Sequence, residues 1–317
     1  MKKFTKVSLI ITAVLLVIGI GCVVVASGMA GGLMALHKQA LTGAFDFGHW
    51  HFGDGVYYSS EDWDEELLDS SAFGLAGGHE SSTETFAMAD IHNITVNTDM
   101  ADITFSASND VENVTITMEM GYLKHYSVSL ENGTLLVEYD TNNKTYESGP
   151  DIIITLPKQV DVEALNVTTA LGDIEFEKMN LSAEKIELET SLGDVELSGL
   201  MVRCNMKLYS AMGDVKIEDG EYQGVEASTS MGEVKLEGTF QGDVSAESSM
   251  GDVKVYLDAE EAVYNFDLST DMGDLHFNGQ HYTDHEALGA ERKFESSQAL
   301  YDVTANTAMG DVEVETK

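Results

Sequence analysis

The sequence predicts an all-β protein, a β-solenoid of ~20-residue coils that is preceded by one N-terminal transmembrane helix. Three observations predict it. A Gly-acid pair occurs seven times at near-constant spacing, apolar and polar residues alternate around each pair, and an uncharged apolar run lies near the N-terminus. A period near 20 residues is typical of solenoids, whose coils stack on their neighbours. We expect a right-handed parallel β-helix, because crossovers between parallel strands are almost always right-handed.

The N-terminal segment carries the membrane signal. Residues 1–6 contain three lysines, and residues 7–26 form an apolar run without a charge. At ~1.5 Å per residue this run spans the ~30 Å hydrocarbon core of a bilayer. Lysines before the run place residues 1–6 in the cytoplasm and the C-terminal domain outside the cell membrane. A cleaved signal peptide is the alternative, but signal cores are usually about 7–15 residues long.

Residues 27–85 are rich in Gly, aromatic and acidic residues and show no sustained period. We interpret them as a flexible spacer between the membrane and the solenoid. His49 and His51 could point to the same side of an extended chain and bind a metal. Two ligands without a third make a weak site, so a solvated loop is the simpler interpretation.

Residues 86–317 form the predicted solenoid. Seven and five residues before each repeat glycine the chain is apolar, and three before it stands Ser or Thr, as in Leu165, Val167 and Thr169. This period of two is typical of a half-buried strand. The alternation of inward-pointing side chains shifts by one residue across the Gly-acid pair. An uninterrupted strand cannot do this, so the chain must bend there. The predicted corners are Gly172, Gly193, Gly213, Gly232, Gly251, Gly273 and Gly310.

One further coil lies upstream, where Ile94–Phe105 fits the same columns with Ala101 in place of the glycine. Because Ala resists a positive φ, we expect close approach between stacked backbones, and not a positive φ, to select glycine. After this coil, Asn132 and Gly133 lie between alternating apolar residues, which predicts a hairpin. This region forms either irregular coils or an antiparallel cap. A two-sheet antiparallel sandwich is the competing fold, but it would not repeat the same columns eight times.

An insertion lengthens the last interval between glycines, and we place this insert loop at residues 278–300. Residues 286–295 have helical composition. His281 and His285 would lie four apart on such a helix, a spacing that can bind metal. No clear third ligand accompanies them, so a surface loop is the simpler interpretation.

The large excess of acidic residues limits the kinds of partner that the chain can bind. Beyond residue 26 the chain has 14 basic and 55 acidic residues, which excludes nucleic acid because the surface repels phosphate. Corner acids stacked ~4.8 Å apart would repel by about 0.9 kcal/mol per pair even in bulk water. We expect each acid to accept hydrogen bonds from backbone N–H groups at its own corner, and a row of Ca²⁺ is the alternative. The row is Asp173, Asp194, Asp214, Glu233, Asp252, Asp274 and Asp311.

A family resemblance rests on Ile152–Pro157 and the following Leu165–Ile174. These segments resemble the bacterial β-strand-repeat family labelled putative adhesin, over roughly residues 90–317. The resemblance implies a single membrane helix with a short cytoplasmic N-terminus, in proteins that are mostly of unknown function. Some relatives look linked to cell-envelope stress responses. The resemblance carries over no catalytic residue.

We therefore expect a membrane-anchored, extracytoplasmic adhesin or surface binding module whose partner is a glycan, a wall polymer or a protein. A cell-envelope stress or structural protein that acts through membrane partners is the second hypothesis. A glycan-active β-helix enzyme is the third, and we expect no enzyme. Such enzymes need acids clustered in a groove, and the Ser/Thr column has no histidine base at a fixed offset. No catalytic or cofactor-binding residue is assigned.

Overall fold

A computed structural model describes residues 46–47, 50–51, 80–109, 112–141, 149–283 and 288–317. The predicted membrane helix at residues 7–26 lies outside them, as do residues 1–6 and most of the spacer. Within the described ranges, no helix has the length and apolarity needed to cross a bilayer. Two short strands, β1 (Asp46–Phe47) and β2 (Trp50–His51), pair antiparallel. All other described strands belong to a compact unit of residues 79–140 and 148–317.

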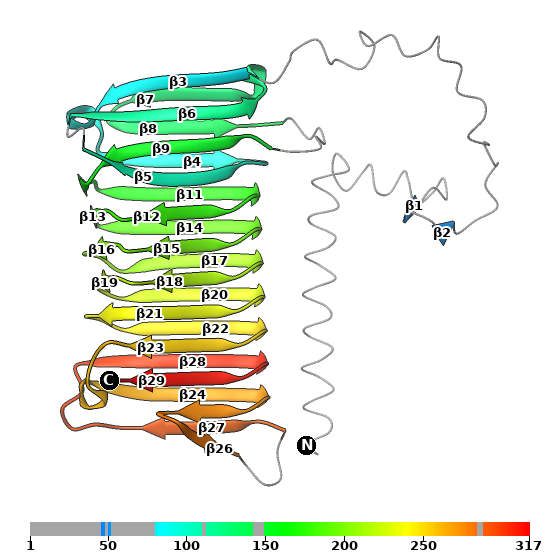
Figure 1. Ribbon diagram of the computed structural model, residues 1–317, viewed down its shortest axis with the longest axis vertical. Coiled ribbons are helices and arrows are strands. Elements are labelled where there is room, and N and C mark those ends of the chain that lie inside the picture. The colour runs from blue at the N-terminus through cyan, green and yellow to red at the C-terminus, as the bar shows by residue number, and fades with distance from the viewer. Residues whose placement is uncertain (1–45, 48–49, 52–79, 110–111, 142–148, 284–287) are drawn as a thin grey trace. The chain divides into compact units, whose positions relative to one another are not determined.

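This unit is a β-solenoid, and the all-β prediction is confirmed (Figure 1). Each coil begins with a long strand that ends at the Gly-acid corner. The long strands pair side by side in parallel register, so that equivalent residues of successive coils stand opposite each other. In spatial order they are β4 (Asn93–Thr98), β11 (Ala164–Leu171), β14 (Lys185–Leu192), β17 (Met206–Met212), β20 (Val225–Met231), β22 (Val244–Met250), β28 (Tyr301–Met309) and β24 (Tyr264–Met272).

After the corner, a second strand runs back and forms a second parallel sheet. Its members are β5 (Asp102–Ser108), β12 (Ile174–Glu177), β15 (Val195–Ser198), β18 (Val215–Glu218), β21 (Val234–Phe240), β23 (Val253–Leu257), β29 (Val312–Thr316) and β25 (Leu275–Phe277). Short return strands close the middle coils: β10 (Gln159–Asp161), β13 (Asn180–Ser182), β16 (Met201–Val202) and β19 (Glu221–Tyr222). The predicted unit of strand, corner, strand and return is therefore confirmed.

The core lies between these strands and consists of stacked columns. The apolar residues seven and five before each corner glycine are at most 4% exposed, as are those two after it. Aromatic rings stack in the same way: the centroids of Phe105 and Phe176 lie 4.1 Å apart with nearly parallel planes. One coil cannot bury these faces alone, so neighbouring coils stabilise each other.

An antiparallel cap covers the first coil, as one of the two sequence interpretations predicted. Strand β3 (Glu80–Ala87) pairs with β6 (Asn113–Gly121), and β6 pairs with β9 (Asp151–Pro157), both antiparallel. A hairpin joins β7 (Tyr126–Glu131) to β8 (Thr134–Tyr139) through Asn132 and Gly133, whose φ angles of 53° and 79° suit a two-residue hairpin turn. Strand β3 starts inside the segment assigned to the spacer.

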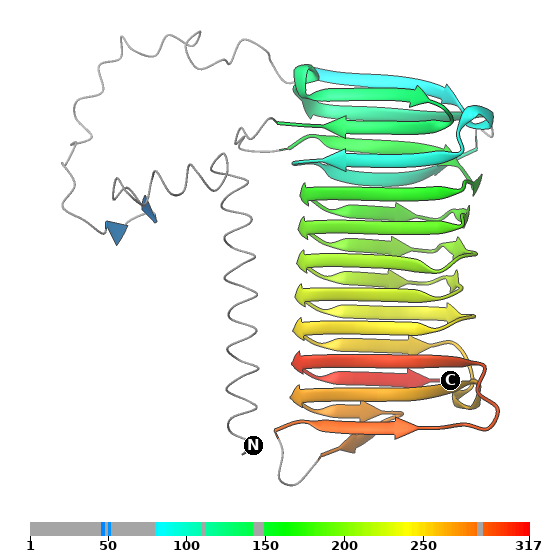
Figure 2. The ribbon, with the colours of Figure 1, turned by 180° about the vertical axis from the view of Figure 1, so that it is seen from behind.

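The last coils do not stack in chain order (Figures 1 and 2). Strand β28 pairs with β22 on one side and β24 on the other, so the coil of Gly310 lies between those of Gly251 and Gly273. The chain passes over one layer, forms the end of the stack, and returns to fill the gap with its final coil.

The insert was predicted as a loop with helical composition at residues 286–295, but its described residues form two strands. Strand β26 (Gln280–Tyr282) pairs antiparallel with β25, and β27 (Ala290–Phe294) pairs antiparallel with β24. The Phe294 ring stacks on Phe277 at 4.3 Å, and Ala290 is buried. Tertiary pairing outweighs helical composition here because β24 would otherwise leave an open sheet edge.

Candidate binding face and corner ladder

Close backbone approach explains the corner glycines, as predicted. A Cβ at Gly213 would lie 2.0 Å from the carbonyl oxygen of Gly193, and the other corners repeat this contact. The expectation about φ was wrong, because all seven glycines have φ between +136° and +159°. Ala101 is absent from the described residues with positive φ. It forms the first corner, and the strands β8 and β9 on its other side carry no Gly-acid pair.

The corner acids accept hydrogen bonds from backbone N–H groups, as predicted, but the donors belong to the corner of the adjacent coil and not to the acid's own corner, so the acids form a ladder. The backbone N–H of Asp194 donates to Asp173 Oδ1 at 2.8 Å, that of Asp214 donates to Asp194 Oδ1 at 2.7 Å, and that of Glu233 donates to Asp214 Oδ1 at 2.8 Å. Asp102, Asp252 and Asp311 accept in the same way. Hydrogen bonds to a charged acceptor are strong, so they offset the repulsion between the stacked carboxylates.

Lysines neutralise part of the acidic surface beside this ladder. Lys216, Lys235 and Lys254 stand in one column on the outer face of the second-strand sheet. The Lys216 Nζ lies 3.1 Å from Glu196, and the Lys235 Nζ lies 2.9 Å from Glu218. Glu175 stands in the same column, but its neighbours there are Thr104 and Glu196 and not a lysine. Its pKa is raised by burial and then by the charges of Glu196 and Asp173. A row of bound Ca²⁺ along the corners stays a prediction.

The Ser/Thr column lies inside the core. Thr190 donates to the carbonyl of Gly172 at 2.9 Å, and Thr229 donates to that of Gly213 at 2.8 Å. The hydroxyls of this column therefore bond to the corner carbonyls of neighbouring coils. Thr98 is the exception: its buried hydroxyl finds no partner among the described residues, since the cap offers no corner carbonyl. The column joins coils and lies away from solvent.

Two histidines and one aspartate meet at the coil of Gly273, which ends the stack. His276 on β25 stands opposite His281 on β26, with ring centroids 4.8 Å apart. The Nε2 atom of His281 lies 3.2 Å from Asp274 Oδ1. His281 lies on a strand, so the helical spacing that could have paired it with His285 does not occur there, and His285 is outside the described residues.

A turn signal could have revealed this cluster. Asn278 and Gly279 join β25 to β26 with φ angles of 48° and 72°. An Asn-Gly pair is a strong hairpin signal, and it would have placed His276 opposite His281. The sequence interpretation used this signal at Asn132 and overlooked it here.

The outer face of the long-strand sheet is polar along its length. Near the corners, one shallow groove of about 430 Å³ is rich in hydroxyl and amide groups. The Tyr209 side chain is 36% exposed there, its hydroxyl lies 3.5 Å from Ser230 Oγ, and Ser269 donates to Asn306 Oδ1 at 2.8 Å. We name as the hydroxyl strip Tyr209, Ser228, Ser230, Ser249, Ser269 and Asn306.

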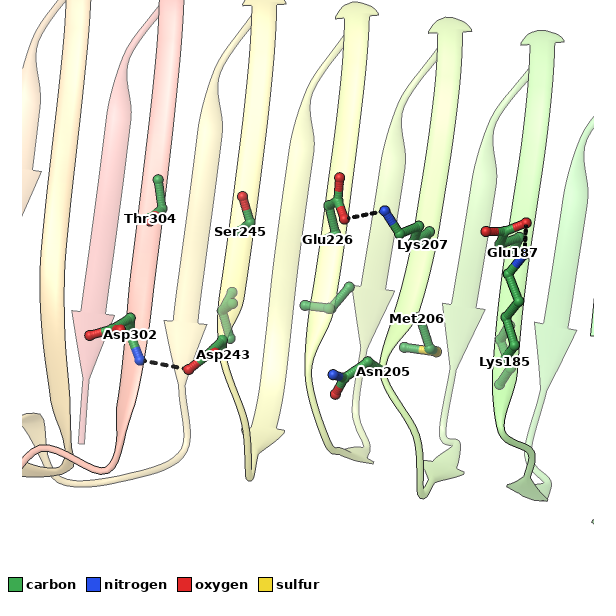
Figure 3. Close-up of a pocket in the computed structure, with 13 residues that line it drawn as sticks. Lys185, Glu187, Asn205, Met206, Lys207, Glu226, Asp243, Ser245, Asp302 and Thr304 are labelled. Atoms are coloured by element: carbon green, nitrogen blue, oxygen red, sulfur yellow. Dashed lines mark hydrogen bonds and ion pairs between the residues drawn. The ribbon is translucent and has the colours of Figure 1, made fainter.

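Nearer the start of the long strands lies a second, charged groove of about 530 Å³ (Figure 3). Lys207 pairs with Glu226 at 2.7 Å across neighbouring strands. Asn205 and Asp243 line the groove on either side of Gly224, whose backbone N–H donates to Asn205 Oδ1 at 3.1 Å. Sequence reasoning missed both grooves, because outward positions vary from coil to coil and carry no motif.

Comparison with known proteins identifies the repeat. The family model described as Toastrack DUF4097 matches residues 91–204 and again residues 178–315. The matches cover the first coil, the cap apart from β3, and all seven Gly-acid corners. No curated protein matches the chain significantly.

Several solved structures resemble the chain at low identity. A "putative adhesin" from Bacteroides fragilis NCTC 9343 has 15% identity and a TM-score of 0.42, covering 75% of this chain and 97% of that one. A "putative lipid binding protein" from Parabacteroides distasonis ATCC 8503 has 16% identity and a TM-score of 0.38, covering 76% and 98%. A "putative cell adhesion protein" from Clostridium sporogenes ATCC 15579 has 11% identity and a TM-score of 0.32, covering 75% and 100%. These names describe those proteins only.

Proposed function

The chain belongs to the Toastrack DUF4097 family, and from this premise we propose that it is an extracytoplasmic surface binding module that binds a glycan along the hydroxyl strip. In this proposal residues 7–26 anchor it in the cell membrane and the spacer holds the solenoid away from the bilayer. The proposal includes no catalytic step.

The hydroxyl strip carries this proposal. It extends over five neighbouring strands, β17, β20, β22, β28 and β24, so at ~4.8 Å per strand it is about 19 Å long. Serine and tyrosine hydroxyls and asparagine amides both donate and accept hydrogen bonds, as sugar hydroxyls do. Tyr209 adds an aromatic surface with a polar tip. A shallow, extended and repeating groove suits a polymer better than a small enclosed ligand.

The negative charge of the protein surface favours some polysaccharides over others as ligands. The chain has a net charge of −38. Glu247 stands inside the hydroxyl strip, in register between Ser228 and Asn306, and Asp271 lines its β24 end. Such a surface repels anionic polymers and attracts cationic groups. We therefore expect neutral or amino-sugar glycans to bind, and strongly anionic wall polymers to bind poorly at low salt.

The test uses the full chain in detergent and a panel of neutral, amino-sugar and anionic polysaccharides, with affinity measured by isothermal titration calorimetry. Tyr209→Ala should weaken glycan binding by about 3–10-fold, because an aromatic contact contributes ~0.5–1.5 kcal/mol. Tyr256→Ala is the matched control: it removes a tyrosine from the second-strand sheet. Equal affinity of the two variants, or no binding by the parent chain, would contradict the proposal.

The alternative is a structural or cell-envelope stress protein that acts through membrane partners. It predicts that the full chain binds no polysaccharide and co-purifies with membrane proteins in a way that requires residues 7–26. Its support is the family resemblance noted above, whereas the glycan proposal is supported by the geometry of the hydroxyl strip.

A further inference from the structure

Asp274, the corner acid at the end of the stack, differs from the other corner acids in its hydrogen-bond partners. At each of six other corners, an aspartate oxygen accepts a backbone N–H from the neighbouring coil. Asp274 gives its own N–H to Asp311, but its coil ends the stack. No backbone N–H of the described residues donates to the Asp274 carboxylate. Its Oδ1 instead lies 3.2 Å from His281 Nε2.

The antiparallel hairpin supplies the other two groups. The turn at Asn278 and Gly279 returns the chain so that His276 and His281 stand opposite each other on one face. Their rings stack with an interplanar angle of 11°. The ligand atoms of the two histidines and Asp274 all lie within 4.8 Å of one another. Three potential ligands, one from a corner and two from the facing strands of a hairpin, therefore converge at one place.

We propose that Asp274, His276 and His281 bind one divalent cation of the zinc class through two imidazole nitrogens and one carboxylate oxygen. Two histidines and a carboxylate form a donor set that suits Zn²⁺, Co²⁺ and Ni²⁺. Ca²⁺ and Mg²⁺ prefer oxygen ligands and bind such a set poorly. With three protein ligands, a fourth position is left for water or for an oxygen of a bound molecule.

The distances are compatible with a tetrahedral site after small side-chain rotations. Metal–ligand bonds of ~2.0–2.2 Å place neighbouring ligand atoms about 3.3–3.5 Å apart, and the 3.2 Å contact between Asp274 and His281 is close to this value. The side chains of His281 and Asp274 are 47% and 57% exposed, so they are free to close the remaining separation and a cation can enter from solvent. Glu313, in register with His276, hydrogen-bonds Tyr256 and is left out of the site.

A bound cation would also stabilise this end of the solenoid. It would link the β25–β26 hairpin to the corner of the same coil. Cation binding is therefore expected to slow amide hydrogen exchange in the hairpin, in addition to its direct spectroscopic signal.

The experiment titrates the chelator-treated full chain with Co²⁺ and then displaces Co²⁺ with Zn²⁺. We expect one tight site per chain, with visible Co²⁺ absorption bands that report nitrogen ligation. Loss of one direct ligand should weaken affinity by about tenfold or more, since loss of a ligand's hydrogen-bonding partner already costs 10–100-fold. The ligand variants are Asp274→Asn, His276→Ala and His281→Ala.

Three matched controls make the result specific. Asp311→Asn changes a corner acid inside the ladder, His92→Ala removes an exposed histidine from a loop beside the first coil, and the double variant His49→Ala/His51→Ala removes the pair in the spacer. All three should bind Co²⁺ like the parent chain. The proposal is overturned if the ligand variants, shown to be folded by circular dichroism, bind normally. It is equally overturned if Asp311→Asn weakens binding as much as Asp274→Asn does, or if the spacer variant abolishes it.

Discussion

Substituting one corner glycine tests the stacking argument directly. In Gly213→Ala, the new Cβ would lie 2.0 Å from the Gly193 carbonyl oxygen and 2.7 Å from Asp194 Oδ1, on a backbone with φ of +149°. The first contact involves backbone that repeats in every coil, so it cannot be relieved by rotating a side chain. The two coils must move apart at this corner or the chain must leave its conformation.

The magnitude follows from what is lost. A non-glycine residue in a disfavoured backbone region costs about 1–3 kcal/mol. Separating the coils also breaks the hydrogen bond from the Asp214 N–H to Asp194 and that from Ser210 to the Gly193 carbonyl, each worth about 1 kcal/mol net. We therefore expect the free energy of unfolding to fall by about 3–5 kcal/mol, a large share of the stability of a typical domain.

The assay is guanidinium unfolding followed by circular dichroism, with amide hydrogen exchange to locate the opening. Gly279→Ala is the matched control: its φ is +72°, yet no atom lies within 4 Å of the added Cβ. It should cost only the conformational strain, about 1–2 kcal/mol. If Gly213→Ala destabilises the chain no more than Gly279→Ala does, close approach is not the reason for the corner glycines. Exchange should accelerate around residues 205–235 in Gly213→Ala.

Three further outcomes follow from single side chains. Thr229→Val removes the buried hydroxyl that donates to the Gly213 carbonyl and should lower the free energy of unfolding by about 1–2 kcal/mol; outward-facing Thr304→Val should change it by less than about 0.5 kcal/mol, and equal effects would refute the role of the hydroxyl. Burial raises the pKa of the Cys204 thiol to about 11, so this thiol should resist alkylation at pH 8 in the folded chain and react in denaturant, as mapped by mass spectrometry; rapid labelling in the folded chain would contradict this. The hydrogen bond and charge of Lys235 hold the pKa of Glu218 below its ordinary value of 4.5, so the stabilisation is present above that pH and is lost as pH falls through the lower folded pKa. Lys235→Gln should raise the Glu218 pKa in an NMR titration, and an unchanged value would count against the ion pair.

Most of the fold follows from the sequence because the coil is a short-range pattern. Thr169, Gly172 and Asp173 repeat at fixed offsets, and each offset places its residue in one column once parallel strands stack in register. The apolar columns, the corners and the extra coil at Ala101 were therefore predicted correctly. The positive φ of the glycines was missed because Ala101 suggested a common backbone conformation, whereas the first corner lies against the cap and differs from the others.

The candidate sites depended on pairings that no local pattern specifies. Asn306 lies beside Ser269 on the hydroxyl strip because β28 inserts between β22 and β24. Residues 286–295 have helical composition within a segment predicted as a loop, but pairing with β24 and the contact of Phe294 with Phe277 make residues 290–294 a strand. His281 was considered as a metal ligand only together with His285, and not with His276.

The sequence by itself determined what a single coil is: its length, its inward columns, its corner and the polar groups that join it to a neighbour. Only the tertiary structure decided which coil stacks on which and how the two ends are covered. The physical reason is that the coils are nearly equivalent, so the edge of one fits the edge of another and repetition alone does not select an order. The insert lies between the last two coils in the chain, and its strand β27 covers the edge of β24, which would otherwise be open. This arrangement leaves Asp274 at the end of the corner row, beside His276 and His281.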